Sequence, residues 1–122
     1  MAKQAMIVLA HGSRNNRANA AFLDLVERVR KETGIDNIAG AFFSLADPDL
    51  SQVVDRLVDE QIQEIAVFPY FLFDGSHVNK DIPELIQRLK ARHPGTSFTL
   101  LKSLEHEPLM LRIIADKTKQ IL

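Results

Sequence analysis

The stretch MIVLAHGSR, residues 6–14, decides the fold that this sequence predicts. Residues 6–10 are all apolar, and the run is too short for a helix, which is typical of a buried strand. His11 and Gly12 follow at once, and glycine allows the backbone to turn sharply. The stretch therefore predicts a buried strand that ends in a tight turn carrying a histidine.

Three further apolar runs, at residues 38–43, 65–71 and 98–101, also predict strands. Between and after the runs, apolar residues recur at helical spacing. This strict alternation predicts an α/β fold: a three-layer αβα domain with a four-stranded parallel sheet, formed by residues 1–122 as a single domain. The four helical stripes are Phe22, Leu25, Val26 and Val29; Leu50, Val53, Val54, Leu57 and Val58; Ile82, Leu85, Ile86 and Leu89; and Met110, Ile113, Ile114 and Ile121.

Three helix starts carry recognisable signals. Asp47 before Pro48 suits an N-cap and first helical residue, and Asp81 with Glu84 has the spacing of a capping box. Pro108 is placed to open the last helix. We therefore expect the second, third and fourth helices to begin at these points.

Composition narrows the possible partners. The net charge of −1 gives no field that would draw the chain onto nucleic acid or an anionic membrane. No cysteine is present, so any metal must bind to His, Asp, Glu or backbone oxygen. No run of 18 apolar residues and no signal peptide is visible, which predicts a cytoplasmic protein without a membrane span.

Ligands of parallel α/β sheets bind beyond the carboxyl ends of the strands. In this chain that edge comprises residues 11–16, 44–49, 72–80 and 102–107. His11, His77 and His106 fall within these loops, whereas His93 stands at a predicted helix end, where a positive charge is favourable. We therefore expect His11 and His77 to lie together at one edge of the sheet.

Two convergent imidazoles bind a divalent transition metal or move protons. The alternative for any single loop histidine is an ordinary surface or capping residue. Around His11, the neighbouring residues form either a ligand-binding turn or a simple strand-to-helix connection. Around His77, exposed aromatic residues suggest a flat apolar ligand, a loop that packs its own phenyl rings, or a subunit interface. The candidate binding residues are Ser13, Arg14, Phe71, Phe73, Gly75, Ser76 and Lys80.

Three segments together resemble a known family. They are LAHGSR at 9–14, AFFSLADPDL at 41–50 and FPYFLFDGSHVNKDIPELIQRLKARHPG at 68–95, of which the third is the most specific. The chain resembles the short CbiX-type class II chelatases, the cobalt or iron sirohydrochlorin chelatases of cobalamin and sirohaem synthesis. The resemblance covers nearly the whole chain, and it implies that His11 and His77 bind the metal and accept pyrrole protons.

The resemblance also implies the reaction and its partners. The chain is expected to insert Co²⁺ or Fe²⁺ into a tetrapyrrole as a homodimer, with Ni²⁺ not distinguished because imidazole suits all three metals. Arg14, Arg17 and Lys80 would pair with substrate carboxylates, while Phe71 and Phe73 would pack on the macrocycle. The GxxxxGK[ST] motif is absent, so no nucleotide is expected.

One departure leaves alternatives open. Many family members carry a glutamate in the second loop, where this chain has Ser44. Asp47, Glu105 or His106 would have to supply the missing carboxylate or base. If none does, the chain is a metal- or tetrapyrrole-binding module without turnover. A histidine phosphatase is the remote alternative, but that family has an arginine immediately before its histidine, where Ala10 stands here.

Overall fold

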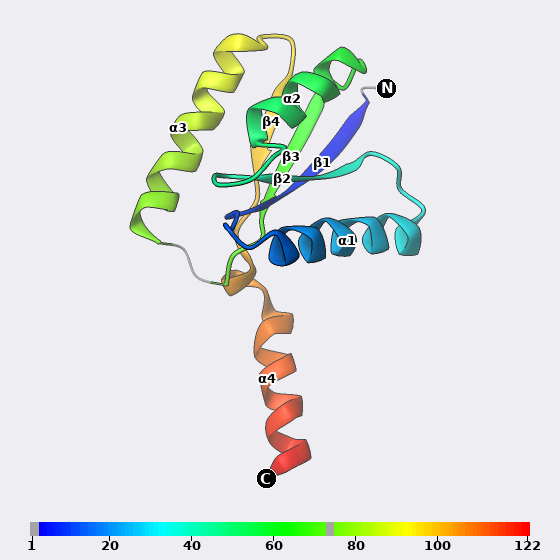
Figure 1. Cartoon of the computed structure of the whole chain (residues 1–122), viewed down its shortest axis with the longest axis vertical. Coiled ribbons are helices and arrows are strands. Elements are labelled where there is room, and N and C mark those ends of the chain that lie inside the picture. The colour runs from blue at the N-terminus through cyan, green and yellow to red at the C-terminus, as the bar shows by residue number, and fades with distance from the viewer. Residues whose placement is uncertain (1–2, 73–74) are drawn as a thin grey trace.

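The chain alternates strands and helices from end to end (Figure 1). A computed structural model describes residues 3–72 and 75–122, with residues 76–78 described by their backbone alone. The predicted βα order is confirmed. The elements are β1 (Gln4–Ala10), α1 (Asn16–Thr33), β2 (Ile38–Phe42), α2 (Leu50–Asp59), β3 (Glu64–Pro69), α3 (Ser76–Arg92), β4 (Ser97–Leu100), the 3₁₀ helix η1 (Leu104–His106) and α4 (Pro108–Ile121).

The strands form one parallel sheet in the order β2-β1-β3-β4. Ile7 of β1 pairs with Ala39 of β2 on one side and with Val67 of β3 on the other. The strand that follows β1 in sequence therefore lies on one side of it, and the strand that comes next lies on the other side. The predicted four-stranded parallel sheet is confirmed.

Helices α2 and α3 cover one face of the sheet and enclose the larger core. Ile7, Leu9 and Val67 are 0 % exposed there, packed with Val54 of α2 and Ile86 of α3. Their spacing on the helices is the one predicted from the sequence. This face alone accounts for most of the apolar burial that stabilises the fold.

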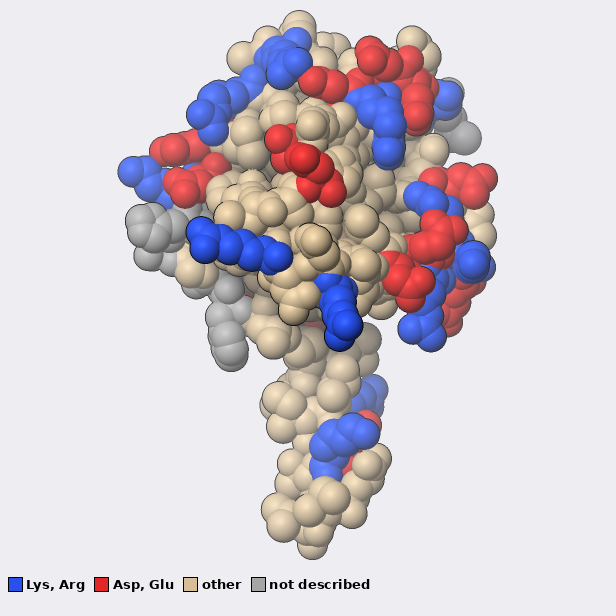
Figure 2. All heavy atoms as spheres, in the orientation of Figure 1, with Lys and Arg blue, Asp and Glu red and all other residues tan. Residues whose placement is uncertain are grey.

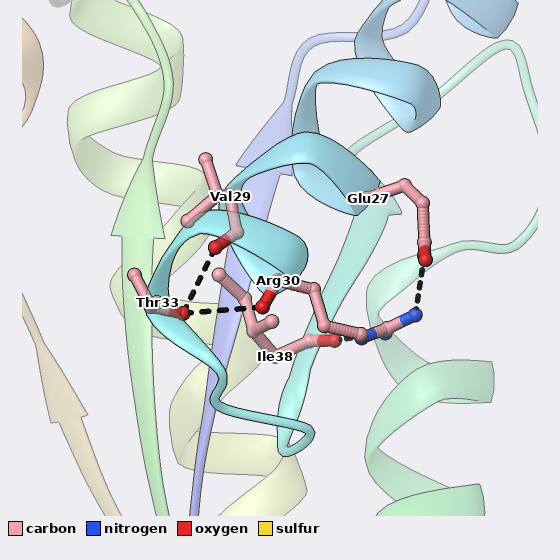
Figure 3. Close-up of polar contacts among 5 residues, drawn as sticks. All are labelled: Glu27, Val29, Arg30, Thr33 and Ile38. Atoms are coloured by element: carbon pink, nitrogen blue, oxygen red, sulfur yellow. Dashed lines mark hydrogen bonds and ion pairs between the residues drawn. The ribbon is translucent and has the colours of Figure 1, made fainter.

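Helix α1 covers the other face, through Phe22 and Val26. Arg30 ties the end of α1 to the start of β2, because its guanidinium donates to the Ile38 carbonyl and contacts Glu27 Oε2 at 2.5 Å (Figure 3). The Thr33 hydroxyl donates to the Val29 carbonyl at 2.8 Å in the same turn. The three predicted layers are thus present, with α1 on one side and α2 and α3 on the other.

The predicted start of α2 is wrong by two residues. Asp49, not Asp47, is the N-cap: its side chain accepts from the Gln52 N–H at 2.8 Å, and the Asp49 N–H donates to Gln52 Oε1 at 2.8 Å. This reciprocal pair is a capping box, which stabilises a helix start more than a lone aspartate does. Asp47 is left exposed in the loop.

The predicted start of α3 is also wrong. The helix begins at Ser76 with Gly75 as N-cap, so Asp81 and Glu84 lie inside it and form no cap. The apolar stripe that starts at Ile82 marks only the part of the helix that meets the core. Residues 76–80, predicted as loop, are therefore helical.

Helix α4 begins at Pro108 as predicted, but it does not cover the sheet of its own chain. It has no buried residue, and it projects away from the rest of the molecule (Figure 1). Across residues 3–72 and 75–122, no helix is long and apolar enough to cross a membrane.

Candidate functional site

The strand order places a topological switch point next to β1. Because the chain goes from β1 outward to β2 and later returns to β3 on the other side, the loops after β1 and β3 leave the sheet in different directions. Such a switch point is where α/β sheets bind ligands. His11 is the first residue after β1, and Tyr70 and Phe71 follow β3 directly.

The backbone around His11 is fixed from both neighbouring strands. The Ser44 N–H donates to the His11 carbonyl at 3.0 Å, and the Phe43 N–H donates to the Ala10 carbonyl at 2.8 Å. On the other side, the Tyr70 N–H donates to the Leu9 carbonyl at 2.7 Å. The loops after the first three strands are therefore held to one another at this point.

Gly12 makes the close approach of these loops possible. Its φ is +93°, a conformation that side chains disfavour, and a Cβ added there would lie 1.6 Å from the Ser44 carbonyl oxygen. No other residue fits without moving the second loop away. The glycine after the histidine thus positions His11 against the loop that follows β2.

Ser13 completes the turn. The Ser13 N–H donates to Asn19 Oδ1 at 3.0 Å, Asn19 Nδ2 donates to the Ser13 carbonyl at 2.7 Å, and the Ser13 hydroxyl accepts from the Asn15 N–H at 3.0 Å. Asn15 in turn caps α1 by accepting from the Arg17 N–H. Ser13 therefore holds the loop onto α1, and a contact with substrate stays a prediction.

The His11 side chain is exposed, and phenyl rings stand beside it. The Phe71 ring centroid lies 5.0 Å from the imidazole centroid, and the Phe43 centroid lies 6.2 Å away at an interplanar angle of 89°. Phe71 itself is only 6 % exposed and belongs to the core. The imidazole is thus supported by the core while remaining accessible to a ligand.

The predicted cations lie on exposed surface near this edge. Arg14 is in the loop after β1, Arg17 is in the first turn of α1, and Lys80 is in the second turn of α3. None of the three forms an ion pair with a residue in the described part of the chain. They are therefore available to an anionic ligand.

His77, the predicted partner of His11, is described by its backbone alone. His77 stands in the first turn of α3, the helix that follows the β3 loop, and the exposed Gly75 caps that helix. The Ser76 and His77 side chains, and the whole of Phe73, lie outside the described residues. Among the residues that are described, no three His, Asp or Glu side chains gather to hold a metal. Joint binding by His11 and His77 stays a prediction.

Ser44 occupies the place of the expected glutamate and touches the His11 loop. Its hydroxyl lies 3.4 Å from the His11 carbonyl oxygen, in addition to the bond made by its N–H. A longer side chain at position 44 would therefore start beside the backbone of the His11 loop. Asp47 lies three residues further on, exposed and free of any capping role.

A cavity of about 210 Å³ lies beyond the carboxyl ends of β3 and β4, next to Phe71. Its lining includes Asn79, Lys102 and His106, and also Ser103, which is 3 % exposed. The Ser103 hydroxyl has no hydrogen-bond partner within the described residues. The sequence predicted that residues 102–107 lie at this edge. It did not indicate Ser103 as a binding residue, because a single serine forms no recognisable motif.

The remaining histidines each contact a carboxylate. His106 Nε2 lies 3.3 Å from Glu105 Oε1, so these two candidate replacements for the missing carboxylate contact each other. His93 is the C-cap of α3, as predicted, and its Nε2 lies 2.8 Å from Asp55 Oδ1, which joins α3 to α2. His93 therefore belongs to the scaffold.

Comparison with known proteins identifies the family to which the chain is similar. The family model described as CbiX matches residues 5–121. The chain is 27 % identical, over 117 residues, to the chloroplastic sirohydrochlorin ferrochelatase of Arabidopsis thaliana, and the match covers 96 % of this chain and 52 % of that protein. The chain thus spans about half the length of this curated relative.

Two solved structures share the fold. The CbiX protein from Marinobacter aquaeolei VT8, described as a putative cobalamin biosynthesis protein, superposes with a TM-score of 0.84 at 34 % identity, covering 96 % of this chain and 95 % of that one. The sirohydrochlorin chelatase SirB from Bacillus subtilis subspecies spizizenii, solved in complex with cobalt, gives a TM-score of 0.84 at 25 % identity. The match covers 98 % of this chain and 51 % of SirB.

Proposed function

The chain belongs to the CbiX family, and from this we propose that it inserts Co²⁺ or Fe²⁺ into sirohydrochlorin without a nucleotide. The observation that carries the proposal is the position of His11. An exposed imidazole, backed by Phe71, stands at the switch point of the sheet on a loop that Gly12 and Ser44 hold in place. We infer the substrate, sirohydrochlorin, from the names of the relatives.

The chemistry needs a base and a ligand at the same point. Metal insertion removes two pyrrole protons and passes a divalent ion to the nitrogens, so the imidazole of His11 either accepts a proton or holds the incoming metal. His77, in the first turn of α3, is proposed as the second such group. Imidazole suits Co²⁺ and Fe²⁺ alike, so these residues do not choose between the two metals.

Charged groups around the switch point would orient the substrate. Sirohydrochlorin carries many carboxylates, and the exposed cations Arg14, Arg17 and Lys80 form no ion pair with a described residue that would compete for them. Lys102 and the Ser103 hydroxyl, which has no partner among the described residues, lie in the cavity beside Phe71 and add further donors. Arginine binds a carboxylate through two parallel hydrogen bonds, so Arg14 is the first candidate for this role.

We also propose that two copies pair as a homodimer. One small domain offers a single sheet edge, whereas a tetrapyrrole has two faces. The chain covers 52 % of its Arabidopsis relative and 51 % of SirB, so two copies have about the length of one such protein. A pair would enclose the macrocycle between two edges.

The test is an absorption assay with sirohydrochlorin and Co²⁺ or Fe²⁺ under anaerobic conditions. The wild-type chain should accelerate the spectral change above a protein-free control. His11→Ala should lower the rate by about 100-fold or more, which is the usual contribution of a general base. Lys31→Ala, at the far end of α1, is the matched control and should keep the rate. A wild-type rate equal to the protein-free rate would contradict the proposal.

Ser44 favours one alternative, a binding module of the same fold. Because a serine stands where a carboxylate is expected, the chain would hold the metal or the tetrapyrrole without joining them. The same assay separates the two functions: tight binding of sirohydrochlorin with no acceleration over the protein-free control would establish the module.

A further inference from the structure

The cavity beyond the carboxyl ends of β3 and β4 shares one wall with the candidate site. Phe71 lies against the His11 imidazole, with 5.0 Å between the ring centroids, and it also lines this cavity of about 210 Å³. Pockets that enclose a whole small molecule usually measure about 300–1,000 Å³. The cavity is therefore of a size to hold one part of a larger ligand whose body lies at His11.

Three segments of one chain line this cavity, which we call the side pocket. They are the end of β3, the first half of α3, and the connection from β4 to η1, which lies where α4 leaves the body (Figure 1). The walls are partly apolar, as at Phe71, and partly polar. Such a lining suits a short hydrocarbon arm that ends in a polar group. The polar residues of the side pocket are Asn79, Lys102, Ser103 and His106.

Ser103 is the unusual residue of the side pocket. It is 3 % exposed, and its hydroxyl has no hydrogen-bond partner among the described residues. A serine at a helix N-cap usually accepts a hydrogen bond from an N–H of the first turn, but Ser103, the N-cap of η1, makes no such bond. A buried polar group without a partner destabilises the fold. A ligand that enters the side pocket would supply the missing partner.

The backbone around Ser103 is held in place by the chain itself. The Leu101 N–H donates to the Val67 carbonyl at 2.9 Å, which ties the connection to β3. The Ser103 carbonyl accepts from the His106 N–H at 3.1 Å, which closes the turn of η1. Only rotation about the single side-chain bond χ1 is needed to turn the hydroxyl toward a ligand. The side pocket is therefore largely preformed, which lowers the cost of binding.

Lys102 gives the side pocket a positive charge. It forms no ion pair with a described residue, whereas the Glu105 carboxylate, in the same connection, contacts His106 Nε2 at 3.3 Å. Among the described residues drawn in Figure 2, Lys and Arg atoms lie in small separate groups, and no broad basic surface covers this face. An anion must therefore be bound by a few local donors. The side pocket offers three kinds: the ammonium of Lys102, the hydroxyl of Ser103 and the amide of Asn79.

We propose that the side pocket binds one carboxylate-terminated side arm of the tetrapyrrole, with the carboxylate on Ser103 and Lys102. The subsite rests on the function proposed above, from which it takes its substrate. The hydroxyl donates one hydrogen bond, the ammonium donates a charge-assisted one, and the Asn79 amide is a third donor. A tetrapyrrole with apolar arms would leave the hydroxyl and the ammonium unpaired in the side pocket. Ser103 and Lys102 therefore select a carboxylate-bearing substrate.

Propionate tests the side pocket without the chelatase reaction, because it is a carboxylate-terminated arm without the macrocycle. In a ¹H–¹⁵N NMR titration the amide signals of Lys102 and Ser103 should shift and saturate, whereas that of Ser97, at the opposite edge of the sheet, should not. In Lys102→Ala the Ser103 signal should need about fivefold more propionate. 1-Propanol, which carries no charge, should leave both signals in place. No saturable shift, or equal shifts with propionate and 1-propanol, would overturn the proposal.

Affinity for metal-free sirohydrochlorin, followed by its absorption spectrum, is the second measurement. Ser103→Ala and Lys102→Ala should each weaken binding about tenfold. Ser97→Ala and Lys90→Ala make the same substitutions away from the side pocket and should leave the affinity unchanged. The double variant of Ser103 and Lys102 should lose less than the product of the two single losses, because both donors bind one carboxylate. Losses that multiply, or single variants that bind as tightly as wild type, would overturn the proposal.

Stability separates a binding role of Ser103 from a structural one. Because the hydroxyl has no partner among the described residues, Ser103→Ala should keep or raise the urea midpoint of the ligand-free chain. A lower midpoint would show that the hydroxyl supports the fold, and it would overturn the proposal. A chain that binds propionate and sirohydrochlorin as expected but inserts no metal would contradict the reaction and support the side pocket. Metal insertion with wild-type affinity in Ser103→Ala and Lys102→Ala would overturn the side pocket alone.

Discussion

The loop after β1 is held by the loop after β2 and by α1, whereas α4, at the other end of the chain, has no buried residue. In the loop, Gly12 and Ser13 are fixed by partners from β2's loop and from Asn19. In α4, the apolar side chains face outward. The residues proposed for the chemistry are thus fixed within one chain, whereas α4 is left without contacts that bury it.

The largest expected effect comes from breaking the loop at Gly12. Gly12→Ala places a Cβ 1.6 Å from the Ser44 carbonyl oxygen at a φ of +93°, so the free energy of unfolding should fall by at least about 4 kcal/mol. Urea unfolding measures the loss.

Gly34→Ala is the matched control. Its φ is +69°, but nothing lies within 4 Å of the added Cβ, so only the backbone term of about 1–2 kcal/mol remains. Equal losses in the two variants would show that the contact with Ser44 does not hold the loop.

The next effect is at Asn19, which bonds both the N–H and the carbonyl of Ser13. Asn19→Ala should lower the free energy of unfolding by about 1–2 kcal/mol, because two partly buried polar groups lose their partner. It should also slow metal insertion, since His11 stands on the loosened turn. Asn16→Ala, one helical turn earlier and exposed, should change neither quantity, and a parallel loss there would assign the effect to α1 instead.

The same contrast explains what the sequence predicted and what it did not. The strands and the His11 turn were predicted because continuous apolar runs and a following glycine are local signals. The covering role expected of α4 was not met, because the stripe of Met110, Ile113, Ile114 and Ile121 shows that a helix has an apolar side without showing which molecule covers it.

Local patterns also misplaced two helix starts. Asp47 before Pro48 has the pattern of an N-cap, but the helix begins after Asp49. The reciprocal hydrogen bonds between Asp49 and Gln52 satisfy the start of α2. In α3 the mostly polar residues 76–80 gave no apolar stripe in the first turns, because periodicity marks only the part of a helix that meets a core. His77 consequently stands on a helix and not in a loop.

A third prediction sharpens the loop side of the comparison by adding the carboxylate that the family usually has. Ser44→Glu places an anionic oxygen donor on the residue bonded to the His11 carbonyl, so Co²⁺ should bind about tenfold more tightly, or about 1.4 kcal/mol. Titration calorimetry measures the affinity. Gln61→Glu, at the opposite edge of the sheet, adds the same charge and should leave the affinity unchanged. If both variants gain equally, the effect is one of net charge and not of the site.

The smallest effect is expected at the end of α4. Ile121 is 82 % exposed, so in a chain diluted to monomers Ile121→Ser should change the free energy of unfolding by less than about 0.5 kcal/mol. At concentrations where two copies associate, the same substitution should become destabilising, because binding of a second copy stabilises the folded state by mass action. Thermal unfolding over a series of protein concentrations measures both. An Ile121→Ser variant that is equally stable relative to wild type at every concentration would show that the end of α4 stays in solvent.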